Sequence, residues 1–301
     1  MILSIIVNIK NLEALIEKCV NSINYALRNC NQNDYEVLLI DDNSTDRTEE
    51  ILKEYVNIHP SFYYKKVCFN NVGKARKHTI PLCKGEYITF VDGDDFLSGF
   101  DMLDIFSILS KEKPDLLITK IQEVFNDKQI IEKQENIKYK IESKDEIISE
   151  FLVHKKFQAH LCSKFFLREL MLKIEFPDVF CYEDAFFFPK YLNLSNKFLY
   201  SDSILYNYIK HPSSLSNNLS KEKIELMAEA IISMLDTLPK KHLHLNISHC
   251  IIHLYKYKKE LKKETIEELK SRINEVNMLS FIFDKKIKLS IKKRYLKIKF
   301  S

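Results

Sequence analysis

The stretch GEYITFVDGDDFL, residues 85–97, carries the clearest signal of fold and function in the chain. Its residues 86–91 are rich in β-branched and aromatic side chains, which is typical of a buried strand. The acidic segment DGDD, residues 92–95, follows directly. Two carboxylates separated by a glycine, which permits a tight backbone, are hard oxygen ligands of the kind that bind Mg²⁺ or Mn²⁺. An acidic surface turn has the same composition, so both interpretations stay open at this point.

Strands and helices alternate on both sides of this stretch. Apolar runs predict four further strands, at residues 4–7, 36–40, 63–69 and 115–119. Helical spacing of apolar residues predicts helices at residues 12–23, 51–55, 103–109 and, briefly, between residue 73 and Pro81. This alternation predicts a mainly parallel sheet with helices on both faces. In such sheets the ligand binds beyond the carboxyl ends of the strands, where residues 41–44 and 92–95 are expected to lie.

The alternation weakens after about residue 125. Residues 126–146 are polar and predict a hairpin or loop, and helical signals return at residues 144–157 and 165–172. The polar stretch at residues 210–220 closes the sheet-bearing part. Residues 221–284 predict helices alone, with an apolar stripe at Ile224, Met227, Ile231 and Leu235.

Composition and charge exclude several classes of protein. The 301 residues are 46% hydrophobic, which predicts a packed core, and no apolar run approaches the length of a membrane span. The net charge is +4, but residues 285–299 hold eight Lys or Arg and no acid, so the remainder carries about −4. We therefore expect no nucleic-acid-binding surface. Seven scattered cysteines without a CxxC pair indicate reduced thiols in the cytoplasm.

Four further clusters hold candidate functional residues, and each also has a structural interpretation. Asp41 and Asp42 can accept hydrogen bonds from a nucleobase or ribose, while Asn43 and Ser44 after them suit a helix cap. The basic residues Lys74 and Arg76 suit a diphosphate at a helix N-terminus, or a solvated helix face.

The other two clusters lie later in the chain. Glu183 and Asp184 precede an aromatic run, where a carboxylate against apolar walls can serve as a general base, although a helix N-cap has the same pattern. His211 can complete a metal site or meet a diphosphate, but a lone histidine is more often structural.

Taken in order, these segments resemble family 2 of the inverting glycosyltransferases, in particular the enzymes of capsule and lipopolysaccharide biosynthesis. The resemblance covers about residues 3–215. It rests on SIIVNIKN (4–11), VLLIDDNSTDRT (37–48), NNVGKARKHTI (70–80), GEYITFVDGDDFL (85–97), SKFFLREL (163–170), YEDAFFFPKYL (182–192) and YNYIKHPSSLSNN (206–218). The chain departs from the family pattern in having Ile9 and Lys10 before Asn11 and in lacking tryptophan.

The resemblance implies an α/β fold of the GT-A type, a mainly parallel sheet between helices, with an α-helical C-terminal extension. Residues 1–220 would form the glycosyltransferase domain, with a donor-binding half at about 1–125 and an acceptor half at about 126–220. Residues 221–301 would form a helical region that ends in a basic amphipathic tail.

The resemblance also implies how a nucleotide-sugar donor, most often a UDP-sugar in this family, would be bound. Asp42 would contact the uracil, with Asn8 and Asp41 nearby. Lys74 and Arg76 would lie near the diphosphate or the base.

The same resemblance implies the chemistry. Asp92 would contact the ribose, Asp94 would bind Mn²⁺ or Mg²⁺, and His211 would be an accessory ligand of the metal or the diphosphate. Asp184 would be the catalytic base, with Glu183 as the competing candidate. The reaction would be a single displacement by a hydroxyl of a saccharide or lipid-linked saccharide acceptor, with inversion at the anomeric carbon.

The basic tail suggests where the acceptor is met. Ile287, Ile291, Tyr295 and Ile298 share one helical face with Lys and Arg around them, so the helix could lie on the anionic inner surface of the cell membrane. The protein would then be cytoplasmic and peripheral on the membrane. A solvated helix or a partner-binding tail is the alternative. Two rival functions also remain: a non-catalytic scaffold subunit of an assembly complex, and a sugar nucleotidyltransferase, for which a Gly-rich phosphate loop is missing.

Overall fold

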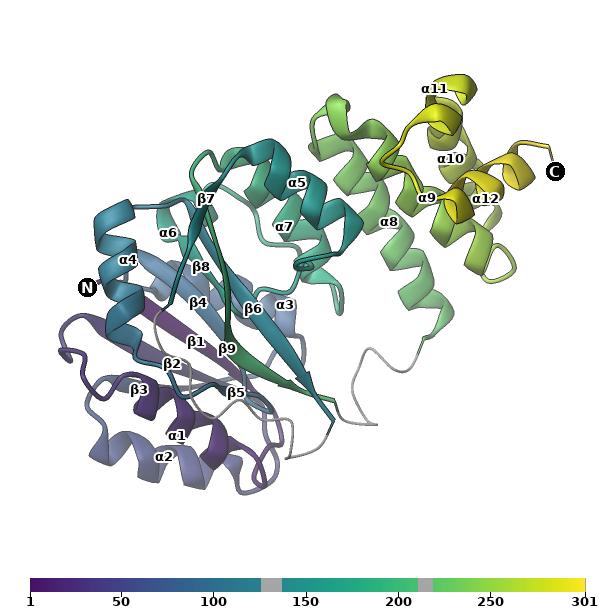
Figure 1. The fold of residues 1–301 in the computed structure, drawn as a ribbon. Helices are drawn as coiled ribbons and strands as arrows, with labels where there is room; N and C mark the ends of the chain where they lie inside the picture. The colour runs from purple at the N-terminus through teal and green to yellow at the C-terminus, as the bar shows by residue number, and fades with distance from the viewer. Residues whose placement is uncertain (126–136, 211–218, 301) are drawn as a thin grey trace. The chain divides into compact units, whose positions relative to one another are not determined.

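The computed structural model describes residues 1–125, 137–210 and 219–300, and the chain forms two compact units (Figure 1). The first unit comprises Met1–Lys144, His160–Glu183 and Leu194–Pro212. The second unit comprises Asp145–Ala159, Asp184–Asn193 and Ser213–Ser301. The chain therefore leaves the first unit three times, rather than once near residue 220 as the sequence suggested.

Within the described residues the first unit holds a nine-stranded sheet in the order β3-β2-β1-β4-β8-β6-β9-β5, with β7 paired to β9 (Figure 1). The strands are β1 (Leu3–Ile9), β2 (Tyr35–Asp42), β3 (Phe62–Val67), β4 (Tyr87–Asp92), β5 (Phe96–Leu97), β6 (Leu116–Val124), β7 (Lys140–Glu142), β8 (Lys164–Leu167) and β9 (Phe198–Ile209). Strands β1 to β4 are parallel, as predicted. Strand β8 runs antiparallel to β4 and β6, and β5 and β7 run antiparallel to β9, so the sheet as a whole is mixed.

Helices cover both faces of this sheet. They are α1 (Ile16–Ala26), α2 (Thr48–Ile58), α3 (Val72–Thr79), η1 (Ile80–Leu82), α4 (Met102–Glu112) and α6 (Arg168–Met171). Alternate side chains of β1, at Leu3, Ile5 and Val7, join the buried stripes of α1, α2 and α4 in one core, because successive strand residues point to opposite faces. Helix α3 covers the other face, where the Arg76 guanidinium lies 5.4 Å from the centre of the Phe90 ring.

The second unit is helical. Its elements are α5 (Lys144–Val153), α7 (Glu183–Leu194), α8 (Lys221–Thr237), η4 (Lys240–His242), α9 (Leu243–Tyr257), α10 (Lys263–Asn274), α11 (Met278–Phe283) and α12 (Leu289–Lys299), the first residues of α5 and α7 belonging to the first unit. Helix α9 is central, since it contacts α8, α10 and α12. The predicted stripe of α8 is confirmed in that Ile224, Ile231 and Leu235 are buried. Across the ranges described above, no helix is both long and apolar enough to span a bilayer.

The helix predicted for residues 165–172 is only partly correct. Residues 164–167 form strand β8, and only residues 168–171 are helical. The reason is tertiary pairing, because Phe165 and Phe166 complete the sheet between β4 and β6 and this contact overrides local helical spacing. In the predicted hairpin, residues 126–136 lie outside the described residues, whereas residues 140–142 form β7.

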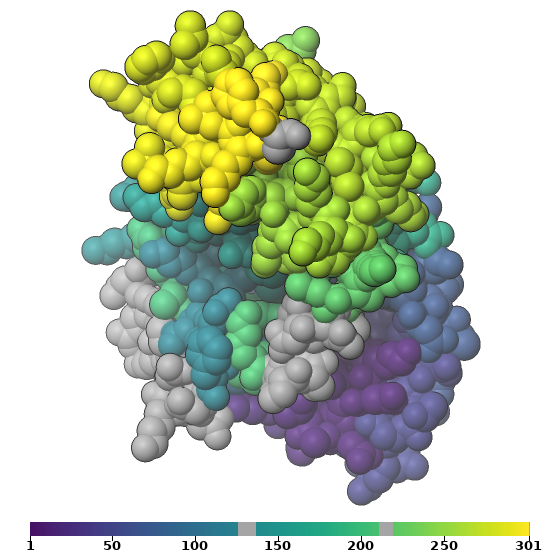
Figure 2. Space-filling model, turned by 90° about the vertical axis from the view of Figure 1, so that its right-hand side faces the viewer, coloured from purple at the N-terminus to yellow at the C-terminus, as the bar shows by residue number. Residues whose placement is uncertain are grey.

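The prediction for the face of the basic tail was wrong. Tyr295 is fully buried, with its ring centre 4.7 Å from that of Phe281, and Ile287 is also buried. The face expected to meet a membrane therefore packs inside the second unit. The apolar side chains that α12 leaves exposed are different ones, Leu289 at 68% and Phe300 next to the helix at 76%; the C-terminal helices are the yellow surface in Figure 2.

Candidate functional site

The carboxyl ends of β1, β2 and β4 bring three predicted site residues together in the first unit. Asn8 pairs in register with Asp92, and the residue after it, Ile9, pairs with Asp41. The Gly93 N–H donates to the Asn8 carbonyl at 3.0 Å. A Cβ at Gly93 would lie 3.1 Å from that oxygen and 2.7 Å from a side-chain carbon of Leu12. The glycine is thus needed for close backbone approach rather than for an unusual φ, since Gly93 does not have a positive φ.

The Asn8 side chain is the strongest sign of a ligand at this edge. Its amide nitrogen and amide oxygen are both buried, and neither has a hydrogen-bond partner among the described residues. A buried hydrogen-bond donor or acceptor without a partner costs roughly 1–3 kcal/mol of stability. Such groups are therefore rare unless they have a function. A ligand that offers both an acceptor and a donor, as a nucleobase or ribose does, would satisfy them.

Asp41 and Asp42 shape the walls of the site. The fully buried Asp41 accepts the Ser44 N–H at 2.9 Å and the Tyr64 hydroxyl at 3.0 Å. Asp42 accepts three successive backbone N–H groups of residues 69–71, at 2.6, 2.8 and 2.7 Å. Both carboxylates therefore fix loops, a structural role that the sequence pattern did not reveal. Direct contact of Asp42 with a base stays a prediction.

Helix α3 delivers one buried and one exposed cation. The Arg76 side chain is only 7% exposed; one of its terminal nitrogens donates to Asp92 Oδ1 at 2.8 Å, and the other forms an ion pair with Glu183. Lys74 is exposed and lies 3.6 Å from Asp178 Oδ1. Of the two basic residues predicted near a diphosphate, Lys74 is the one whose ammonium group is accessible. Arg76 instead holds two predicted site residues in place.

The loop after β4 is tied to the far side of the sheet by Asp95, which the sequence did not single out as a site residue. Asp95 is 1% exposed and accepts the Tyr206 hydroxyl and the Ile209 N–H, both at 2.7 Å. The same Tyr206 oxygen accepts the Asp92 N–H at 3.0 Å. Burial, with the charges of Asp92 and Asp94 added, raises the pKa of Asp95 to about 8. Its position within DGDD was the available signal, but the sequence does not distinguish the roles of the three aspartates in this segment.

The metal prediction centres on Asp94, which is half-buried. No group of three or more His, Cys, Asp or Glu that could hold a metal occurs among the residues with described positions. Mg²⁺ and Mn²⁺ at substrate phosphates need only one or two carboxylates, the remaining ligands being phosphate oxygens and water. The hard oxygens of Asp94 and neighbouring Asp92 fit that requirement. The predicted accessory ligand His211 lies outside the described residues.

The two candidates for the catalytic base differ in their surroundings. Glu183 belongs to the first unit and is paired with Arg76 in a buried position. Asp184 belongs to the second unit, where its Oδ1 accepts the N–H of Ala185 at 2.8 Å. Adjacent acids in the sequence thus occupy different environments.

Comparison with known proteins gives a family match and a curated relative. The family model described as glycosyl transferase family 2 matches residues 4–174. The chain is 30% identical over 122 residues to the poly(ribitol-phosphate) beta-glucosyltransferase of Bacillus spizizenii, a match that covers 40% of the chain but only 19% of that relative.

Two solved structures share the fold. TarS 1-349 of S. aureus, in complex with UDP-GlcNAc, has a TM-score of 0.72 at 20% identity, and the match covers 100% of this chain and 91% of that one. GalNAc-T7 with UDP, GalNAc and Mn²⁺ has a TM-score of 0.58 at 14% identity, covering 95% and 56%. The expected GT-A architecture with a helical C-terminal region is therefore confirmed.

Proposed function

Because the chain belongs to glycosyl transferase family 2, we propose that it transfers a sugar from a UDP-sugar to a hydroxyl of a saccharide or lipid-linked saccharide during synthesis of a bacterial surface polysaccharide. The observation that carries the proposal is the Asn8 amide beside Asp92 at the carboxyl ends of the strands, since this amide is buried and has no hydrogen-bond partner in residues 1–125, 137–210 and 219–300. The fold it shares with a structure that holds UDP-GlcNAc supports the choice of donor.

In this proposal the first unit binds the donor. The Asn8 amide and the Asp92 carboxylate hydrogen-bond the uridine, and the exposed ammonium group of Lys74 attracts the diphosphate. Asp94, with His211 as a further ligand, would hold a Mn²⁺ or Mg²⁺ ion, which would supply Lewis-acid stabilisation of the leaving diphosphate. Asp42 contacts the uracil with Asp41 nearby, and the loop contacts of Asp41, Asp42 and Asp95 keep the surrounding backbone in place.

Asp184 is the proposed general base. A base must accept the proton of the acceptor hydroxyl, and for Glu183 this would break its buried ion pair and leave that side of the Arg76 charge uncompensated. Asp184 follows Glu183 directly, and its Oδ1 accepts the backbone N–H of Ala185. With Asp184 accepting the proton, the hydroxyl oxygen attacks the anomeric carbon as the diphosphate leaves, and the configuration inverts.

The place of action that we propose is the cytoplasmic surface of the cell membrane. The support is the outer side of α12, where Leu289, Leu296 and the following Phe300 are exposed and share a helical face by their spacing. Lys292 and Lys293 lie one turn after Leu289, close to this stripe. Apolar side chains with basic neighbours suit an anionic bilayer surface.

Nucleotide-dependent stabilisation tests the proposed donor site. The full chain would be unfolded thermally with a panel of nucleotides, with Mn²⁺ or with a chelator. UDP at a hundredfold excess over its Kd should add about 2.7 kcal/mol to the free energy of unfolding. Asp94→Ala should abolish the metal-dependent part, whereas Asp104→Ala, an exposed acid on α4, should leave it unchanged. No stabilisation by any nucleotide in folded protein would favour a non-catalytic scaffold instead.

A further inference from the structure

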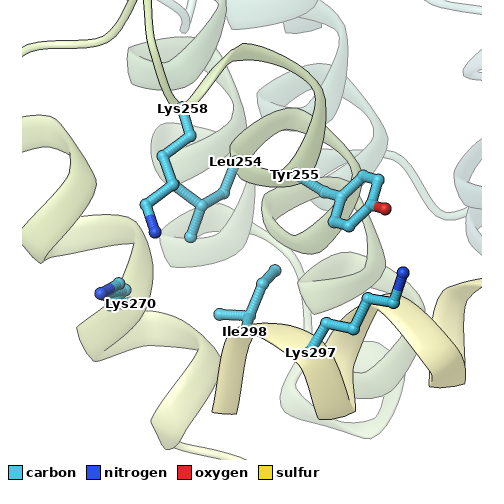
Figure 3. Close-up of a pocket in the computed structure, with 6 residues that line it drawn as sticks. All are labelled: Leu254, Tyr255, Lys258, Lys270, Lys297 and Ile298. Carbon is cyan, nitrogen blue, oxygen red and sulfur yellow. The ribbon is translucent and has the colours of Figure 1, made fainter. Parts of the chain in front are cut away.

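The second unit holds a cavity of about 220 Å³ that no part of the proposed reaction uses. It is lined by Leu254, Tyr255, Lys258, Lys270, Lys297 and Ile298 (Figure 3). These residues come from α9 and the residue that caps it, from α10 and from α12. Three helices that are separate in sequence thus each contribute one lysine to a single cavity.

The cavity has an uncompensated positive charge. None of Lys258, Lys270 and Lys297 forms an ion pair with a carboxylate in the part of the chain that the structure describes, and the lining holds no acid. Arg294 and Lys297 lie 5.2 and 5.8 Å from the centre of the Tyr255 ring, which adds a further cation at the rim. Like charges gathered on folding repel one another within a Debye length, so an anion bound among them would be stabilised.

The remaining lining is apolar. Leu254 is 1% exposed and Ile298 is half-buried. In Figure 3 these two side chains lie between the ammonium groups of Lys258 and Lys270 on one side and Lys297 with Tyr255 on the other. A bare inorganic ion would use the cations and leave this apolar surface uncovered. A phosphate attached to carbon would use both.

A structural role explains only part of this arrangement. Lys258 caps the C-terminal end of α9, where a cation is stabilised by the helix dipole. That effect does not account for Lys270, which lies inside α10, or for the meeting of all three with Lys297.

We propose that this cavity binds a phosphate ester. Lys258, Lys270 and Lys297 would neutralise the phosphate, and Leu254 and Ile298 would contact the carbon atoms attached to it. Two sources present this chemistry, the headgroup of a phospholipid and a soluble polyol or sugar phosphate. The site is independent of the proposed donor site, and it would be occupied whether or not that site binds UDP.

The test uses the full chain in the presence of a chelator, so that metal-dependent binding elsewhere does not contribute. One arm titrates glycerol 3-phosphate by calorimetry. The other sediments the protein with phosphatidylcholine vesicles, with and without phosphatidylglycerol. The cavity variant carries Lys258→Gln, Lys270→Gln and Lys297→Gln. The matched control carries Lys259→Gln, Lys262→Gln and Lys263→Gln, which remove the same charge from exposed neighbouring positions that do not line the cavity.

At least one probe should bind the wild-type chain, and the cavity variant should weaken that binding about tenfold or more while the control changes it less than twofold. Loss confined to the vesicle arm identifies a lipid headgroup, and loss in the calorimetric arm identifies a soluble phosphate ester. Equal weakening of binding by the two variants would mean that general surface charge is responsible, and this would overturn the proposal. Failure of the wild-type chain to bind either probe would also overturn it. Lys297→Gln alone, with its thermal unfolding midpoint measured alongside, separates loss of binding from loss of folding.

Discussion

Arg76 links two candidate site residues that lie far apart in the sequence, Asp92 and Glu183. It was predicted as a ligand of the diphosphate, yet its side chain is 7% exposed and joins Asp92 of β4 to Glu183 at the start of α7. A buried cation must be matched by paired anions, since the cost of an unpaired charge is several kcal/mol. Glu183 therefore has a reason to be acidic that requires no role as a base.

If Asp184 is the base and Glu183 is the buried partner of Arg76, their neutral variants should differ. One should lose activity and the other should lose stability. Asp184→Asn should lower kcat by about 10²–10⁴-fold, because proton transfer is lost, and should leave the free energy of unfolding nearly unchanged. Glu183→Gln should lower the free energy of unfolding by roughly 3 kcal/mol, because Arg76 loses one buried partner. Steady-state kinetics with a UDP-sugar and urea unfolding of each variant measure the two effects.

The structure supplies a matched control on the same helix. Lys74 and Asp178 form an exposed pair, with side chains 45% and 54% accessible, so Asp178→Asn should cost less than about 1 kcal/mol. If Glu183→Gln proved as stable as Asp178→Asn while abolishing turnover, the assignment of Asp184 as the base would have to be reversed.

At the scale of elements, β9 holds the acidic loop in position. Tyr206 lies in β9 and is completely buried; its hydroxyl donates to Asp95 and accepts the N–H of Asp92. The pairing of Phe96 with Asn207 adds a short antiparallel ladder beside this contact. The backbone of the acidic segment 92–95 is therefore fixed by side-chain contacts with β9 and by the backbone pairing of the adjacent β5 with it.

Tyr206→Phe removes only this hydroxyl and tests how far the loop depends on it. We expect a loss of about 1–3 kcal/mol in the free energy of unfolding, because the buried Asp92 N–H and Asp95 carboxylate lose a partner. The Kd for UDP with Mn²⁺ should rise, since Asp92 and Asp94 become less well positioned. Urea unfolding and calorimetry measure these changes, and Tyr200→Phe, whose hydroxyl donates to the exposed Asp202 at 3.2 Å, serves as the control. An unchanged Kd in Tyr206→Phe would show that the loop is held without β9.

The contrast between β1–β4 and the later strands shows what local pattern can predict. The first four strands are parallel, apolar and separated by amphipathic helices, so period and spacing alone located them. Strands β8 and β9 were missed, because their pairing partners are far away in the sequence and their local signals resemble helix or loop. The acids of the site were located by their position after β2 and β4. The loop contacts of Asp41, Asp42 and Asp95 depend on partners such as residues 69–71 and Tyr206, which no local pattern names.

At the scale of the whole molecule, the helical unit is assembled from three separate segments of the chain. Residues from α5, far before the C-terminal helices, complete its core. One contact that links them is made by His249 of α9, whose Nε2–H donates to the Leu152 carbonyl of α5 at 2.8 Å. The ring of His154 lies 5.0 Å from that of His249. The second unit thus contains a half-buried histidine whose neutral form suits this packing.

The pKa of His249 leads to a prediction of how the free energy of unfolding of the second unit changes with pH. Burial, with the charge of His154 added, lowers the pKa of His249 to about 4, against about 6.5 for an unfolded histidine. Between those values the unfolded state binds more protons than the folded state, so the free energy of unfolding falls as the pH falls through this window. Between a pH above the unfolded pKa and a pH below the folded pKa, the free energy of unfolding falls by roughly 3 kcal/mol. Burial lowers the pKa of His253 and His242 as well, which acts in the same direction.

Replacing His249 separates its contribution to the pH dependence of stability from the contributions of the other histidines. His249→Gln can keep a donor toward Leu152 but cannot gain a proton, so its urea midpoint should change less between pH 7 and pH 5 than that of the wild type. His78→Gln, at an exposed position on α3, should keep the wild-type pH dependence. Far-UV circular dichroism in urea measures all three proteins. Parallel pH profiles for wild type and His249→Gln would mean that His249 is protonated without unfolding, and the acid sensitivity of the helical unit would then have to come from His253 and His242.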